Sequence, residues 1–377
     1  MADFSGLPIR EELEGFEPYG APQLDVPVLL NVNENPYPPS QAVVDDIARA
    51  VTEAAGGLNR YSDREFLALR NDLAAYLGAE SGADLTGEQV WAANGSNEVM
   101  LHLLQAFGGP GRTALSFAPT YSMYPEYARD TNTTWVTGRR ETDFTIDVEH
   151  ALATLAEHRP SVVLLASPNN PTGTALPLDV IERITKTCAE LPCVVVVDEA
   201  YGEFRRAGTP SAVTLLPSYR NLAVARTMSK AFALAGARVG YLAAGRDLVD
   251  ALRIVRLPYH LSAVTQAVAR AALRHRDELL GRVAELRTAR DETVEWLRAR
   301  GLEAVDSDAN FVLFGRFADR HGVWQAVLAD GVLIRETGPD GWLRVSIGSP
   351  AENDAFRRSL TAYLDRVPEA TVSEVQA

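Results

Sequence analysis

The chain has few of the residues that define several common classes of protein. Among its 377 residues only two are cysteines, Cys188 and Cys193, so a disulfide framework is not expected. Its six histidines are scattered and form no ligand spacing with the cysteines, so no metal site is predicted. The formal net charge of −14 argues against nucleic acid or an anionic membrane as a partner, because both favour a basic face.

Long apolar runs are also absent. The densest run, CVVVVDEAY, is far too short to span a bilayer. The first residues, MADFSGLPIREELEG, are acidic and lack the apolar centre of a secretory signal. We therefore expect a cytoplasmic protein. Its length exceeds what one hydrophobic core usually supports, which predicts one large and one smaller domain.

Short apolar runs organise the middle of the chain. From Gln89 to about Gly245, runs such as TALSFA, SVVLLA, CVVVVD and LAVART alternate with helix-like or loop segments. Their unbroken apolar character is typical of strands buried on both faces of a mostly parallel sheet flanked by helices. The sequence therefore predicts an α/β fold with an N-terminal arm over 1–40, a large domain over 41–260 and a smaller α+β domain over 261–377. A helical stretch over roughly 262–300 should be broken or bent.

Polar residues follow these runs where the strands should end, which is the edge at which α/β sheets bind ligands. In NGSNE, Gly95 permits close backbone approach, and Ser96 and Asn97 supply capping oxygens and free N–H groups for an anion. Asp198 follows four valines. An unpaired carboxylate there would cost several kcal/mol, so it needs a cation or several hydrogen-bond donors.

Further strand ends supply two aromatic rings and an amide. Tyr121 follows TALSFAPT, Asn170 lies in the SPNNPTG turn, and Tyr201 comes three residues after Asp198. Taken one at a time, the strand-end residues have ordinary explanations: a helix cap, a core aromatic, a turn and a structural salt bridge.

Lys230 indicates that these residues belong to one site. It follows LAVART, beside Thr227 and Ser229, with Arg238 eight residues later. Hydroxyls and an arginine around a lysine suit a second half of the anion site. A desolvated lysine near a guanidinium has a lowered pKa and can be a free amine nucleophile at neutral pH.

A planar aromatic cation that carries an aldehyde and a phosphate would use all of these groups, which predicts pyridoxal 5′-phosphate as the cofactor. Lys230 would hold the aldehyde as a Schiff base, and Asp198 would pair with the protonated ring nitrogen. Two unit charges about 4 Å apart gain about 4 kcal/mol at an effective dielectric near 20, enough to keep that nitrogen protonated. The remaining contacts would be stacking by Tyr121, hydrogen bonds from Asn170 and Tyr201 to the ring hydroxyl, and phosphate binding by Ser96, Asn97, Ser229 and Arg238.

Seven motifs occur in one order along the chain: NENP, NGSNE, PTYSMY, SPNNPTG, DEAYGEF, RTMSKAFALAGAR and LRVSIG. In this combination the chain resembles the histidinol-phosphate aminotransferases, which belong to the fold-type-I pyridoxal-phosphate enzymes. The resemblance runs from about Leu29 to about Asp354. It implies a homodimer with shared active sites and a role in histidine biosynthesis, with amino transfer between glutamate and imidazole-acetol phosphate. Many members have aspartate where this chain has Asn97, and backbone contacts to phosphate would survive that change.

The resemblance also implies substrate and subunit contacts. Tyr61 in NRYSD matches a tyrosine that reaches the cofactor phosphate of the other subunit. Arg344 in WLRVSIG matches the arginine that binds the glutamate carboxylate and, in the other half-reaction, the phosphate of histidinol phosphate. Helpers at that phosphate are Arg335 and Tyr19, and the expected lining of the same pocket includes Asn33 and Asn35.

Three other functions fit parts of this pattern. An aromatic amino-acid aminotransferase would keep the cofactor and place a tyrosine or phenylalanine ring where the imidazole lies. A phosphoamino-acid decarboxylase of similar fold would release carbon dioxide without a keto acid. A cofactor-binding regulator would need a DNA-binding module, and no helix-turn-helix segment or basic patch precedes the arm.

Overall fold

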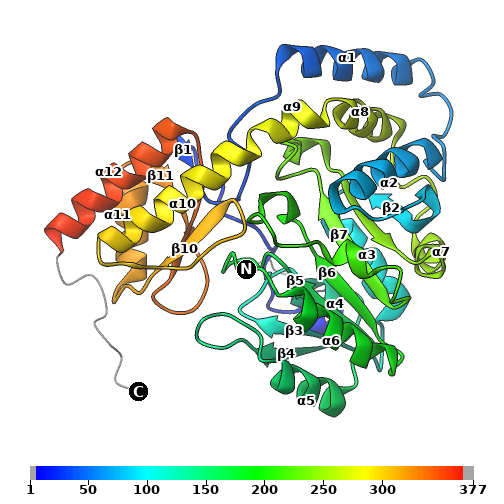
Figure 1. Ribbon diagram of the computed structural model, residues 1–377, viewed down its shortest axis with the longest axis horizontal. Helices are drawn as coiled ribbons and strands as arrows, with labels where there is room; N and C mark the ends of the chain where they lie inside the picture. Colours follow the sequence, from blue (N-terminus) through cyan, green and yellow to red (C-terminus); the bar gives the residue numbers. More distant parts are fainter. Residues whose placement is uncertain (1–5, 368–377) are drawn as a thin grey trace.

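A seven-stranded sheet forms the centre of the larger part of the protein, seen in a computed structural model that describes residues 6–367 (Figure 1). Its strand order is β2-β8-β7-β6-β5-β3-β4, and β8 runs opposite to the rest. The predicted α/β fold with a mostly parallel sheet is therefore confirmed. The strands are β2 (Val90–Ala93), β3 (Thr113–Ala118), β4 (Thr134–Arg139), β5 (Val162–Ala166), β6 (Val194–Asp198), β7 (Leu222–Thr227) and β8 (Gly240–Ala244).

Helices flank this sheet (Figure 1). The helices of the larger part are α1 (Gln41–Ala55), α2 (Leu67–Ser81), α3 (Ser96–Phe107), α4 (Tyr124–Asp130), α5 (Val148–His158), α6 (Leu178–Ala189), α7 (Arg246–Val255), α8 (Ala263–Arg274) and α9 (Arg276–Gly281). Of these, α1 packs on α8 and lies farther from the sheet (Figure 1). Short 3₁₀ turns lie at Glu11–Leu13, Gly87–Gln89, Gly202–Phe204, Ala212–Leu215 and Ala235–Ala237. Within residues 6–367, no helix combines the length and the apolar character that crossing a bilayer requires.

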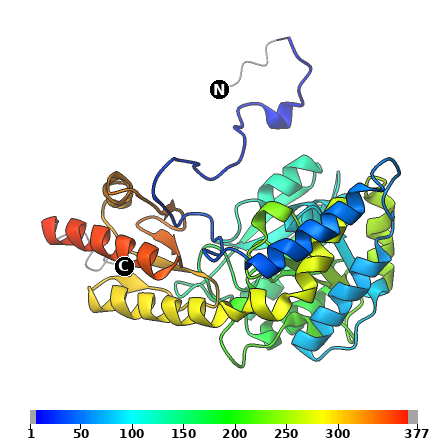
Figure 2. The same cartoon turned by 90° about the horizontal axis from the view of Figure 1, so that it is seen from above.

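A second sheet, of order β12-β13-β10-β9, forms the smaller part. Its strands are β9 (Glu303–Ala304), β10 (Phe311–Gly315), β12 (Arg335–Glu336) and β13 (Leu343–Ser346). Around it lie α10 (Val283–Ala299), α11 (Arg320–Ala329) and α12 (Pro350–Arg366) (Figure 1). In the arm, β1 (Val28–Leu29) pairs in parallel with β11 (Val332–Leu333), so this part of the arm packs with the smaller part. The 3₁₀ turn at Glu11–Leu13 projects away from both sheets (Figure 2).

The packing bears on where the two parts divide. The helical stretch predicted over 262–300 is interrupted twice, between α8, α9 and α10, which confirms the expected break. Leu279 in α9 packs in the larger core, whereas Leu286 in α10 packs in the smaller one. The boundary between 260 and 261 stays a prediction, and the packing favours a division near residue 281. Residues 1–5 of the predicted arm and 368–377 of the predicted smaller domain lie outside the described residues.

A buried ion cluster joins the carboxyl ends of β6 and β7. Arg226, which has no exposed surface, donates from Nε to Glu199 Oε2 at 2.8 Å and from Nη1 to Glu203 Oε1 at 3.0 Å. A Cβ added to Gly202 would lie 2.7 Å from the guanidinium carbon of Arg226, so the segment between the two glutamates requires glycine. The cluster fixes the end of the strand that carries Asp198 against the end of the next strand.

We expect Arg226→Leu to lower the free energy of unfolding by about 3–5 kcal/mol, because Glu203 would remain buried without the cation that pairs with it among the described residues, and Glu199 would keep only Arg205. Urea titration followed by circular dichroism measures the loss. Arg220→Leu is the control, since the ion pair of Arg220 with Asp247 is exposed to solvent and its removal should barely move the midpoint. Equal small effects in the two variants would contradict the role given to the cluster.

Candidate active site

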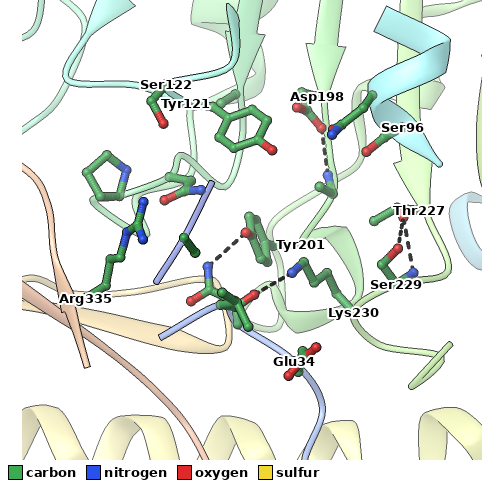
Figure 3. A pocket seen from close by; sticks show the side chains of 18 of the residues that line it. Glu34, Ser96, Tyr121, Ser122, Asp198, Tyr201, Thr227, Ser229, Lys230 and Arg335 are labelled. Carbon is green, nitrogen blue, oxygen red and sulfur yellow. Dashed lines mark hydrogen bonds between the residues drawn. The ribbon is translucent and has the colours of Figure 1, made fainter. Parts of the chain in front are cut away.

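One cavity, of about 290 Å³, lies at the carboxyl ends of β5, β6 and β7, between the two parts of the protein (Figure 3). Most of the residues predicted for the site line it, although they come from distant segments. The predicted residues in the lining are Tyr19, Asn33, Ser96, Asn97, Tyr121, Asn170, Asp198, Tyr201, Thr227, Ser229, Lys230, Arg238, Arg335 and Arg344. Gly95 precedes Ser96 at the start of α3, whereas Asn35 and Tyr61 lie outside the lining.

Asp198 ends β6 as a buried carboxylate. Its Oδ2 accepts a hydrogen bond from the Tyr124 hydroxyl at 2.9 Å, and its Oδ1 accepts one from the Ala200 N–H at 3.1 Å. Burial raises the pKa of Asp198 to about 6, although these two hydrogen bonds oppose the rise. Within residues 6–367 no lysine or arginine forms an ion pair with it, so the structural salt bridge that the sequence left open is not present there.

Lys230 lies across the cavity from Asp198 (Figure 3). Its Nζ donates to the Val32 carbonyl of the arm at 2.7 Å and lies 6.0 Å from the centre of the Tyr201 ring. Burial, followed by the nearby Arg344 charge, lowers the pKa of Lys230 to about 8. More of this amine is therefore neutral near pH 8 than in an ordinary lysine, as a nucleophile or a base requires.

Hydroxyls and N–H groups gather on one side of the cavity. Thr227 Oγ1 donates to Ser229 Oγ at 3.0 Å, and Arg238 Nη1 lies 3.4 Å from the same Ser229 oxygen. Gly95, at φ +90°, caps the N-terminus of α3 so close to Arg238 that a Cβ there would collide with the guanidinium. The helix N-terminus, two hydroxyls and a guanidinium thus converge as an anion site.

The opposite side of the cavity carries two arginines from the smaller part. Arg344 in β13 pairs in register with Arg335 in β12, and within the described residues neither forms an ion pair with a carboxylate. Arg344 donates to Asn170 Oδ1 at 2.5 Å and to the Asn31 carbonyl at 2.7 Å. Burial lowers the pKa of Arg344 to about 10, and the charge of Arg335 adds to this effect. Two neighbouring guanidiniums without a counter-ion suit an anionic ligand.

Comparison with known proteins identifies the family. The family model for aminotransferase class I and II matches residues 26–360. The chain belongs to this family.

Similar proteins include histidinol-phosphate aminotransferases over nearly the whole length of this aminotransferase. That of Thermobifida fusca (strain YX) is 62% identical over 360 residues, which cover 96% of each chain. That of Bifidobacterium longum (strain NCC 2705) is 56% identical over 381 residues, which cover 97% of this chain and 98% of that one.

Two solved structures show the same fold. Histidinol-phosphate aminotransferase from Sinorhizobium meliloti, in complex with pyridoxal-5′-phosphate, has a TM-score of 0.78 at 24% identity and covers 91% of this chain and 92% of its own. Aspartate aminotransferase from Thermus thermophilus with maleate has a TM-score of 0.77 at 24% identity, with coverage of 90% and 91%.

Several groups at the site of this aminotransferase escaped the sequence analysis. Tyr124, the hydrogen-bond donor to Asp198, ends the PTYSMY motif three residues after Tyr121. That spacing, at the start of a helix, could have pointed to it. The carbonyl groups of Asn31 and Val32 carry no side-chain signature, so sequence reasoning could not have found them.

Tyr61 and Tyr19 differ from the other predicted residues in their exposure. Tyr61 is 81% exposed and its ring stacks on Tyr259, with centroids 4.3 Å apart and planes 13° apart. Tyr19 is half-exposed, and its hydroxyl lies 2.7 Å from Ser122 Oγ at the rim of the cavity. Asn35 does not line the cavity, and its Nδ2 donates to the Ala231 carbonyl at 3.1 Å.

We expect the stability of the cofactor-free protein to report the raised pKa of Asp198. With a pKa of about 6 when folded and 3.8 otherwise, the carboxyl destabilises the fold as pH rises from about 4 to 6. Asp198→Asn removes this effect. The free energy of unfolding of the variant minus that of wild type should therefore grow between about pH 4 and 6, and it should level off at about 3 kcal/mol at higher pH. Urea titrations between pH 4 and 8 measure it. A difference that stays constant with pH would refute the assignment.

Proposed function

We propose that this aminotransferase transfers an amino group between glutamate or 2-oxoglutarate and imidazole-acetol phosphate or histidinol phosphate, with pyridoxal 5′-phosphate as its cofactor. One observation carries the proposal: two arginines that pair with no carboxylate within residues 6–367 face a lysine–aspartate pair across a single cavity. The relatives named histidinol-phosphate aminotransferase, at up to 62% identity, support this choice of substrate. A cytoplasmic location stays a prediction.

The residues present fit the cofactor. Asp198 is a buried carboxylate without a cationic partner in the described chain, and a pyridinium N–H would supply one. The phosphate would lie at the N-terminus of α3, held by Ser96, Asn97, Thr227, Ser229 and Arg238. Tyr121 would cover the ring face, and Asn170 and Tyr201 would bind the ring hydroxyl. When bound, pyridoxal phosphate withdraws electrons from the substrate carbon that loses its proton.

Lys230 would act twice in this site. Its lowered pKa allows the amine to bind the cofactor aldehyde covalently. As a free amine, Lys230 would accept the proton that leaves the substrate Cα and would deliver it to the other end of the 1,3-proton shift. The Val32 carbonyl, 2.7 Å away, orients the Nζ atom for this transfer.

Arg344 and Arg335 would bind the distal anion of both substrates. Asn170 and the Asn31 carbonyl hold the Arg344 guanidinium in one plane, which favours paired hydrogen bonds to a carboxylate or phosphate. Tyr19, at the rim, would add a hydroxyl for the larger phosphate ester, and Asn33 keeps the Tyr201 hydroxyl in place through a 2.9 Å hydrogen bond.

We expect Lys230→Ala to abolish both the visible absorbance of the bound cofactor and turnover. The chain contains only one other lysine, Lys186, which is exposed on α6 and provides the matched control. Lys186→Ala should keep both properties. The proposed role of Lys230 would be falsified if its alanine variant retained the wild-type spectrum and rate.

The choice of substrate is tested by the spectrum of the purified holoenzyme. Histidinol phosphate should remove the visible band and 2-oxoglutarate should restore it, whereas phenylalanine should leave it unchanged. Comparison of kcat/KM for the two amines gives the preference. A higher value for phenylalanine would favour an aromatic amino-acid aminotransferase, since a ring without a phosphate would then suffice.

A homodimer with shared active sites is part of the proposal. Tyr61 stacks on Tyr259 in a region where Ile254 and Leu257 are 84% and 74% exposed, and such exposed apolar groups favour an interface.

Tyr61→Phe should weaken cofactor retention in dialysis while sedimentation still gives the mass of a dimer. A wild-type monomer that is fully active would exclude shared sites.

A further inference from the structure

The turn between β12 and β13 rests on a residue from the larger part. This turn, residues 337–342, links the strands of Arg335 and Arg344. At its end, the ring of Trp342 packs edge-on against Phe144, with centroids 5.5 Å apart and planes 76° apart. Phe144 lies in the loop that follows β4 and reaches toward the smaller sheet (Figure 1). The two parts of the protein therefore meet through these two rings.

Leu313 connects this contact to the substrate arginine. It is fully buried in the same cluster as Phe144 and Trp342, and it is the cross-strand partner of Arg344 in the β10–β13 pair. Cross-strand partners lie side by side on one face of a sheet. A Cβ added to Gly338 would lie 3.0 Å from Leu313 and 3.5 Å from Trp342, so the turn itself packs on the cluster. A shift of the Phe144 ring would therefore reach Arg344 through one layer of side chains.

Phe144 is held in a costly conformation by Arg140. Its φ of +66° lies in the left-handed region, which bulky side chains rarely adopt and which marks functional constraint where it persists. The guanidinium of Arg140 donates to the Phe144 carbonyl at 3.0 Å and to the Phe117 carbonyl at 3.1 Å. Arg140 is buried, and within residues 6–367 it forms no ion pair with a carboxylate. Phe117 belongs to β3, the strand that leads to Tyr121.

We propose that Phe144 is a positioning residue. Its ring packs against the cluster of Trp342 and Leu313 and so determines the position of Arg344 and Arg335 relative to the cavity residues of the larger part of the protein. Phe144 does not line the cavity itself, so it acts only through the smaller part. Arg140 keeps the loop in place. The inference rests on the proposed function, because it concerns the binding of the substrate anion by the two arginines.

The test uses Phe144→Ala holoenzyme and the binding of 2-oxoglutarate, which cannot react without an amino donor. Calorimetry should give a Kd about tenfold weaker than wild type. KM for glutamate and histidinol phosphate should rise by a similar factor while kcat changes less than about twofold, since the anion contact serves ground state and transition state alike. Phe144→Tyr, which keeps the ring, should restore both values.

Matched variants separate positioning from loss of stability. Trp296 makes a comparable edge-on contact with Phe356 at the border of the smaller core, with centroids 6.1 Å apart, so Trp296→Leu should lower Tm without changing Kd. If Phe144→Ala yields no folded protein, Phe144→Leu replaces it, with an expected increase in Kd of about threefold.

A Kd within the error of wild type in a folded Phe144 variant, or an equal increase in Trp296→Leu, would overturn the inference and leave the proposed function intact. A wild-type holoenzyme that binds no 2-oxoglutarate would instead refute the proposed function.

Discussion

The site depends on a buried arginine that does not touch the cavity. Asp198 and Lys230 come from the ends of two neighbouring strands, and Arg226 ties those ends together through Glu199 and Glu203. With Glu80 and Arg205 included, three carboxylates face two guanidiniums. Burial raises the pKa of Glu203 above its ordinary value, although the charge of Arg226 opposes the rise. The opposite charges at the ends of β6 and β7 thus hold the Lys230 amine and the Asp198 carboxylate at a fixed separation.

Much of this arrangement could be predicted from the sequence because buried parallel strands leave a simple pattern. Unbroken apolar runs marked β3, β5, β6 and β7, and the ends of those runs located Asp198 and Lys230. The edge strand β4 was not predicted, since TWVTGR has no unbroken apolar run and Gly138 is its single buried position. Tyr61 and the two arginines proposed to bind substrate required the resemblance to a family, because a lone tyrosine or strand arginine has no local pattern that separates it from a surface residue.

The arm shows why sequence reasoning stopped where it did. Three of its consecutive residues contact functional groups: the Asn31 carbonyl binds Arg344, the Val32 carbonyl binds Lys230, and the Asn33 amide binds the Tyr201 hydroxyl. Two of these contacts use backbone atoms that every residue possesses, and all three span nearly 170 residues or more of chain. Side-chain chemistry and periodicity describe neither feature, so only the folded structure brings them together.

The pairing of β1 with β11 has a further consequence for the smaller part. The chain passes between the two parts once after β1 and again between α9 and α10. Two covalent tethers confine the smaller part to fewer orientations than one tether would allow, which raises the effective concentration of its arginines at the strand ends. A single cut of the chain after β1 would remove no side chain from the cavity. It would, however, allow the smaller part more orientations, so that the binding of a substrate anion would cost more entropy.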